Sequence, residues 1–225
     1  MKKILFIILF VLISSNAWSA IVYDAYSSDD SGWASSLTFS HTVADEDDRL
    51  MIVQGLANAG KDVTGVTFNG DSFTQVETAG DWHSNSQWYL LNPDVGTHDV
   101  VVTYNSAEII EANAMSFYGV KQQAPEATIL KNGTSPTPDE DISTVTDNAL
   151  VIDTLAALES LVSVNEDQTE IYNNTDRVNF DAVGSTKLVP TAGVTNMGYT
   201  LDTNAQYTMI ISVWEEAGAA VTYIQ

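Results

Sequence analysis

The sequence contains no cysteine, and only 8 of its 225 residues are lysine or arginine, against 30 aspartates and glutamates. The absence of cysteine excludes disulfides and thiol nucleophiles, so the folded state has to depend on a hydrophobic core. The shortage of basic side chains argues against a nucleic-acid partner or an anionic membrane surface, because both are bound through lysine and arginine. The formal net charge of −22 instead favours solubility and attracts divalent cations.

Catalytic motifs are also missing. The three histidines, His41, His83 and His98, form no H-E-x-x-H zinc motif, and neither a G-x-S-x-G elbow nor a phosphate-binding loop is present. Carboxylates are so abundant that no catalytic pair stands out, and we expect Glu108 and Glu111 to be solvated charges at strand ends. The sequence therefore predicts a protein that is not an enzyme.

The N-terminal residues 1–20 have the pattern of a secretory signal peptide. Lys2 and Lys3 precede the apolar run 4–13, and residues 17–19 place small side chains at the −3 and −1 positions of a cleavage site. The apolar run is shorter than the ~20 residues that a bilayer requires, so we expect a mature chain that is not embedded in a membrane. Cleavage would leave 6 basic and 30 acidic residues, a formal charge of −24, in the periplasm or outside the cell.

The rest of the chain alternates short apolar runs with turn residues, which predicts an all-β protein. The main runs are 37–43, 50–56, 63–68, 88–91, 98–104, 112–118, 186–189, 194–201 and 207–214. Asn69-Gly70 is a strong signal for a hairpin turn. We predict an antiparallel β-sandwich of jelly-roll type, with one domain over 21–217 and a strand-like tail over 218–225.

Three features of this pattern leave alternatives open. Residues 42–53 resemble residues 144–153, about one hundred positions later, which indicates either an internal repeat or a coincidence. Residues 132–141 have the composition of a linker. Residues 148–164 fit the pattern of a helix, but the surrounding β pattern favours a strand over residues 149–157.

Several segments, in this order, resemble a widespread bacterial secreted-protein module. They are LMIVQGL, VTFNGDSFTQV, WYLLNPDVGTHDVVVTY and MSFYGVKQQAP, followed by GSTKLV, VTNMGYTL and YTMIISV. The resemblance implies a jelly-roll β-sandwich, covers nearly all of the mature chain and brings no catalytic residues with it. It also implies structural roles for Trp88, Val100, Val102, Phe117 and Val120.

The acidic loop 45–48 is the candidate metal site. Hard cations prefer several oxygen ligands, and Asp45, Asp47 and Asp48 supply carboxylates within four positions. The alternative is a solvated acidic loop. We therefore regard weak calcium binding by these three side chains as a hypothesis.

The polar segment 78–86 is the candidate ligand site. It shows no strand pattern, and binding residues gather on loops. An indole at Trp82, beside His83, could stack on the apolar face of a sugar ring. The alternative is a tryptophan that covers the end of the sandwich.

Two classes of function fit these features. The first is a non-catalytic secreted or cell-surface module for binding or adhesion, with an extracellular glycan as a possible partner. The second is a structural subunit that assembles with other copies of itself, in which the strand-like ends 20–25 and 219–225 would complete the sheets of neighbouring subunits.

Overall fold

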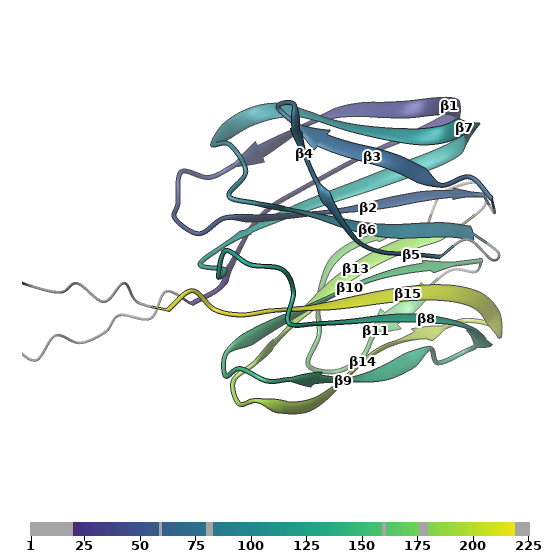
Figure 1. The fold of residues 1–225 in the computed structure, drawn as a ribbon. Coiled ribbons are helices and arrows are strands. Elements are labelled where there is room, and N and C mark those ends of the chain that lie inside the picture. Colours follow the sequence, from purple (N-terminus) through teal and green to yellow (C-terminus); the bar gives the residue numbers. More distant parts are fainter. Residues whose placement is uncertain (1–19, 59, 80–82, 159–160, 176–179, 219–225) are drawn as a thin grey trace, which may run out of the picture.

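The computed structural model describes residues 20–58, 60–79, 83–158, 161–175 and 180–218 (Figure 1). These residues form fifteen β-strands in antiparallel sheets, which confirms the predicted all-β class. No helix that could cross a membrane occurs among them. The predicted leader, apart from its last residue, and the tail residues 219–225 lie outside the described residues.

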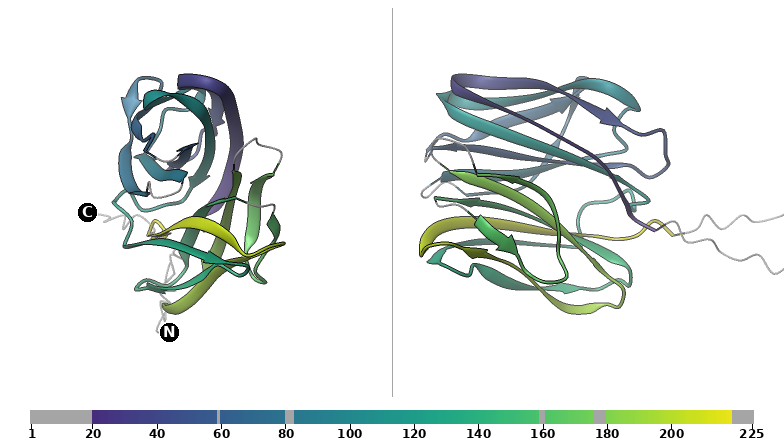
Figure 2. Two further views of the ribbon diagram at one scale, coloured as in Figure 1. Left: turned by 90° about the vertical axis from the view of Figure 1, so that its right-hand side faces the viewer. Right: turned by 180° about the vertical axis from the view of Figure 1, so that it is seen from behind.

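The first seven strands form one sheet in the order β4-β3-β7-β2-β6-β5, with β1 paired to β7. Their bounds are β1 (Val22–Val43), β2 (Leu50–Asn58), β3 (Val63–Phe68), β4 (Asp71–Ser72), β5 (Thr74–Ala79), β6 (His83–Leu91) and β7 (Gly96–Tyr118). The long strands β1 and β7 bend together, so the sheet curls almost into a barrel (Figure 2). Asn69 and Gly70 join β3 to β4 with φ angles of 50° and 91°, as the hairpin signal predicted.

The other eight strands form two sheets, in the orders β12-β13-β10-β15-β8 and β11-β14-β9. Their bounds are β8 (Ala127–Ser135), β9 (Asp139–Thr144), β10 (Ala149–Ala157), β11 (Leu161–Val164), β12 (Thr169–Asn174), β13 (Asp181–Val189), β14 (Gly193–Leu201) and β15 (Ala205–Trp214). Residues 149–157 are thus a strand, as predicted. The linker prediction for 132–141 is wrong, because most of this segment lies in β8 and β9, where it pairs with β15 and β14.

The two sets of strands have the same topology, and we call β1–β7 the first unit and β8–β15 the second unit. Strand β2 lies between β6 and β7, and β10 lies between β13 and β15. The two halves of β1 pair with the two halves of β7, whereas in the second unit β8 pairs with β15 and β9 with β14. This is jelly-roll order in both units. Residues 21–217, predicted to form one domain, therefore hold two jelly-roll units.

The units also match in register. The matched pairs along β6–β7 and β13–β15 differ by 97 positions, as 188 minus 91, 193 minus 96 and 214 minus 117. They are Leu91 and Leu188, Gly96 and Gly193, and Phe117 and Trp214, and the strand pairing also matches Leu50 with Leu150. Asp48 and Asn148, each two residues before a matched leucine, both have positive φ angles, 57° and 56°. The repeat seen in the sequence is therefore an internal repeat of structure.

The units pack face to face around a shared core. It includes Leu50, Ile52, Met115 and Phe117 from the first unit and Leu150, Ile152, Phe180 and Trp214 from the second. The first strand of each unit meets the other unit in the same way: Tyr26 of β1 stacks on Tyr172 of β12, and Thr128 of β8 donates a hydrogen bond to Glu77 of β5. The arrangement is therefore approximately two-fold symmetric. Each unit also has its own core, inside the curled sheet and between the two smaller sheets respectively.

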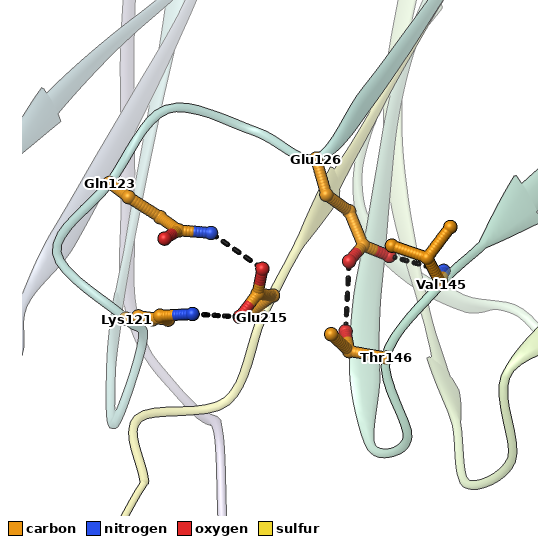
Figure 3. A network of polar contacts seen from close by, with 6 residues as sticks. All are labelled: Lys121, Gln123, Glu126, Val145, Thr146 and Glu215. Atoms are coloured by element: carbon orange, nitrogen blue, oxygen red, sulfur yellow. Dashed lines mark hydrogen bonds and ion pairs between the residues drawn. The ribbon is translucent and has the colours of Figure 1, made fainter.

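The connection between the units is fixed to the end of β15 (Figure 3). The ammonium group of Lys121 pairs with the Glu215 carboxylate, and the Gln123 side chain donates to the same carboxylate at 2.6 Å. Glu126 accepts hydrogen bonds from the Val145 amide and the Thr146 hydroxyl, each at 2.9 Å. These contacts hold the connecting segment 121–126 against the second unit.

Three sequence predictions concern residues that the fold buries or pairs. The five residues with predicted structural roles are all buried, as expected: Trp88, Val100, Val102, Phe117 and Val120. The N-terminal segment is not free for a neighbouring subunit, because β1 pairs with β7 from Val22 onward. The runs 98–104 and 112–118 were expected to be separate strands, but they belong to one bent strand, β7.

Candidate functional site

The segment 78–86 was predicted to be a polar loop, and this is wrong for residues 78–79, which end β5, and for residues 83–86, which begin β6. His83 begins β6 and is only 9% exposed; its ring packs edge-on against Phe180 with 5.5 Å between the ring centroids. Burial lowers the pKa of His83, which keeps the imidazole neutral. Trp82 lies outside the described residues, so its proposed sugar contact stays a prediction.

Two buried polar side chains of β6, Asn85 and Gln87, bond across the shared core. The Asn85 amide donates to the backbone carbonyls of Thr154 and Thr208 in the second unit, at 3.3 and 3.1 Å. Gln54 of β2 donates to Asn85 at 3.0 Å and to the Leu155 carbonyl at 3.2 Å. These bonds satisfy polar groups that would otherwise be costly to bury. We call this set of bonds, with Tyr172, the polar seam.

The polar seam leads to a buried carboxyl group, Glu111, which is 1% exposed. Its Oε1 atom accepts hydrogen bonds from the amides of Asn113 at 3.0 Å and Asn174 at 2.8 Å. The Tyr26 hydroxyl donates to Asn113 at 2.8 Å, and Tyr172 donates to Gln54 at 2.6 Å. Burial raises the pKa of Glu111 to about 6, and the two amide hydrogen bonds limit that rise. The prediction that Glu111 is a solvated charge is therefore wrong.

A small cavity of about 40 Å³ lies beside Glu111, with room for one or two water molecules. Its walls are formed by Asp30, Ser31, Gly32, Ile109, Ile110, Glu111 and Phe180. The cavity lies where β1 and β7 bend, and β1 shifts its register against β7 on both sides of Ala34. This bend is at the end of the molecule opposite the start of β1 and the end of β15, and we call it the distal end (Figure 1).

Trp33 follows the cavity wall directly and is 71% exposed. The other two tryptophans among the described residues are buried: Trp88 and Trp214 each donate their indole N–H to a serine hydroxyl two positions earlier, Ser86 and Ser212. Trp33 therefore presents an apolar ring to solvent, and the residues just before it in the chain, Asp30, Ser31 and Gly32, line the cavity. An exposed ring next to polar groups is suited to stack on a ligand that is itself partly apolar and partly polar.

The acidic loop 45–48 is held mainly by its backbone. The carbonyls of Asp47 and Asp48 accept hydrogen bonds from Gly119 at 3.2 Å and Val120 at 2.9 Å, and the Arg49 guanidinium donates to the Glu46 carbonyl. Asp45 and Asp47 are exposed and Asp48 is half-buried. In the described part of the chain, no group of three or more histidine, aspartate or glutamate side chains is placed to hold a metal ion. Calcium binding here stays a prediction.

Sequence reasoning missed Trp33 and Glu111. Trp33 lies in a stretch of serine, aspartate and glycine that was not recognised as part of β1, and the alternation of the strand pattern is broken there by the bend. A lone tryptophan in a small, polar segment was the available signal. No protein-family model matches the chain, and no curated protein matches its sequence.

Proposed function

We propose that the protein is a non-catalytic binding module, exported from the cell, that takes glycans at its distal end. The observation that carries this proposal is the 71% exposure of Trp33, which directly follows in the chain the residues Asp30, Ser31 and Gly32 that line the cavity. Sugar rings have an apolar face that stacks on aromatic rings and hydroxyl groups that bond to carboxylates and serines. Trp33 replaces Trp82 and His83 as the centre of the binding hypothesis.

Two further features support the proposal. The signal-peptide pattern and the resemblance to secreted bacterial modules agree with a role outside the cytoplasm. The distal end lies away from the start of β1 and the end of β15, so a ligand bound there would not interfere with a chain or surface attached at the other end (Figure 2). The competing idea of a subunit that donates its N-terminal strand loses its support, because that strand pairs with β7 in its own chain.

A glycan array followed by calorimetry tests the proposal. Trp33→Ala should weaken binding of the best glycan by about tenfold or more, which corresponds to ~1.4 kcal/mol for each tenfold change. Trp33→Phe should keep most of the affinity, because the ring is retained. Val194→Ala is a matched control, since Val194 is also 71% exposed but belongs to β14 of the second unit. Equal binding by Trp33→Ala, or no glycan bound by the unaltered protein, would contradict the proposal.

A further inference from the structure

The approximate two-fold symmetry of the units makes one difference visible at their interface. On one side, the ring of Tyr89 from β6 packs edge-on against Trp214 of β15, with 5.2 Å between ring centroids. The matched residues on the other side are Thr186 of β13 and Phe117 of β7, since both pairs differ by 97 positions (186 minus 89, 214 minus 117). A threonine therefore stands where the symmetric contact has a tyrosine ring.

An open apolar groove occupies the place of the missing ring. Its volume is about 220 Å³, and Ile21, Tyr23, Phe117, Leu150, Ile171 and Leu188 form most of its lining. Tyr23 and Leu188 remain 43% and 48% exposed, although both face other apolar groups. Exposed apolar surface of this kind costs free energy in water unless something covers it.

The same symmetry indicates which segment reaches the groove. In the first unit, residues 121–126 lead from the end of β7 to the start of β8 and bond to β15 on the way. The repeat matches this segment with residues 218–223, which follow β15 in the chain and of which the structure describes Gly218. In the first unit, β1 pairs with the end of β7 from Val22 onward. Ile21, just before β1, and Tyr23, near its start, line the groove.

The chemistry of this segment fits the groove. Residues 219–225, AAVTYIQ, carry no charged side chain in a chain with 30 acidic residues, and they include Val221, Tyr223 and Ile224. Seven extended residues span at most ~25 Å. We propose that residues 219–225 of the same chain dock in this groove and fill the place that Tyr89 fills on the symmetric side. This inference does not depend on the glycan proposal.

A double-mutant cycle on the melting temperature tests the docking. Removing residues 219–225 should lower Tm, by ~2–4 °C for each kcal/mol of lost contact in a protein of this size. In a Thr186→Tyr background, where the new ring fills the groove, the same truncation should leave Tm unchanged. Val194→Tyr is the control, because it adds the same ring outside the groove and should preserve the effect of truncation. Equal shifts in the Thr186→Tyr and unaltered backgrounds, or no shift in either, would overturn the inference.

Disulfide trapping tests the location directly, because the natural chain has no cysteine. In the full chain, Leu188→Cys with Tyr223→Cys should form a disulfide within one molecule under mild oxidation, seen by mass spectrometry after proteolysis. Leu130→Cys with Tyr223→Cys should not, since Leu130 lies on β8, at the opposite edge of the same sheet from β12. A crosslink between two molecules would overturn the assignment to the same chain and indicate a second copy as the occupant. The absence of any crosslink would overturn the docking itself.

Discussion

Val53 of the first unit and Asp153 of the second unit occupy the same position of the same strand, yet their surroundings differ in kind. Val53 belongs to an apolar core inside the curled sheet. The Oδ1 atom of Asp153 accepts hydrogen bonds from the Ser185 amide at 3.1 Å, the Ser185 hydroxyl at 2.6 Å and the Tyr199 hydroxyl at 2.6 Å. Burial raises the pKa of Asp153 to about 6 while these bonds hold it down. The comparison shows that one topology and one register accommodate either an apolar side chain or a buried carboxyl group that accepts several hydrogen bonds.

The largest loss of stability is expected when the aspartate of the second unit is placed at the matched position of the first unit. Val53→Asp would place a carboxylate, fully buried, among apolar side chains that offer it no donors, and we expect a loss of more than about 4 kcal/mol or no folded protein. The measurement is urea unfolding followed by circular dichroism. Val145→Asp, at a position that is 74% exposed, is the control and should change stability by less than ~0.5 kcal/mol. Normal stability of Val53→Asp would show that the two interiors are interchangeable.

Burial of His41 and Asp153 in different units should give opposite dependences on pH. The folded pKa of His41 is lowered by burial to about 4, below the 6.5 of the unfolded chain, although Asp24 nearby raises it. The unfolded state then binds more protons, so His41 costs about 3 kcal/mol of stability as pH falls from 6.5 to 4. The folded pKa of Asp153 is about 6 against 3.8 unfolded, so its contribution rises by about 3 kcal/mol as pH falls over that range.

Denaturant titrations at several pH values check these two signs. His41→Gln should remove the loss of stability at acid pH, and Asp153→Asn should remove the gain, so the two difference curves against the unaltered protein should slope in opposite directions. The groups facing His41 are the hydroxyls of Ser27 and Ser116 and, through Ser116, the Asp24 carboxylate. Difference curves of the same sign would refute the contrast between the two units.

A smaller loss of stability is expected from a glycine substitution in the second unit, compared with one in the first unit. A Cβ atom at Gly184 would lie 2.2 Å from Cε1 of Tyr172, the ring that reaches across the shared core to Gln54. Gly184→Ala should therefore cost ~1–3 kcal/mol, as overpacking does. Gly65→Ala in the first unit meets nothing within 4 Å and should be neutral within ~0.5 kcal/mol. Thermal unfolding of both variants decides the point, and equal Tm values would contradict the close approach of Tyr172.

Most of the fold could be predicted from the sequence, but little of the candidate site could. Alternating apolar residues and turn signals such as Asn69-Gly70 predict strands because they act locally, and they held for β3, β4, β10 and β15. The run Ser84 to Gln87 failed for a physical reason. The polar side chains of Asn85 and Gln87 bond across the shared core to residues 67 to 123 positions away in the chain, and those of Ser84 and Ser86 bond within the first unit. Local patterns cannot reveal such partners.

The internal repeat is clear in the structure but visible in only a short part of the sequence. Only residues 42–53 and 144–153 resemble each other visibly, because a jelly roll constrains the register and the apolar alternation but not the identity of each side chain. Trp88 matches Ser185 and Tyr89 matches Thr186, for example, although their strands pair identically. The groove and the carboxyl group at Asp153 both arise from such differences between matched positions.

Native-state hydrogen exchange tests the central claim, that two matched units share one core, most directly. The most protected amides of β2 and of β10, whose side chains alternate between their own core and the shared one, should exchange through a single global opening. These amides should show the same free energy of opening, equal to the free energy of unfolding from denaturant titration. Gly184→Ala should lower the free energy of opening by the same amount in both strands. Protection of β2 that is unchanged when β10 is destabilised would show two independent domains and would contradict the account.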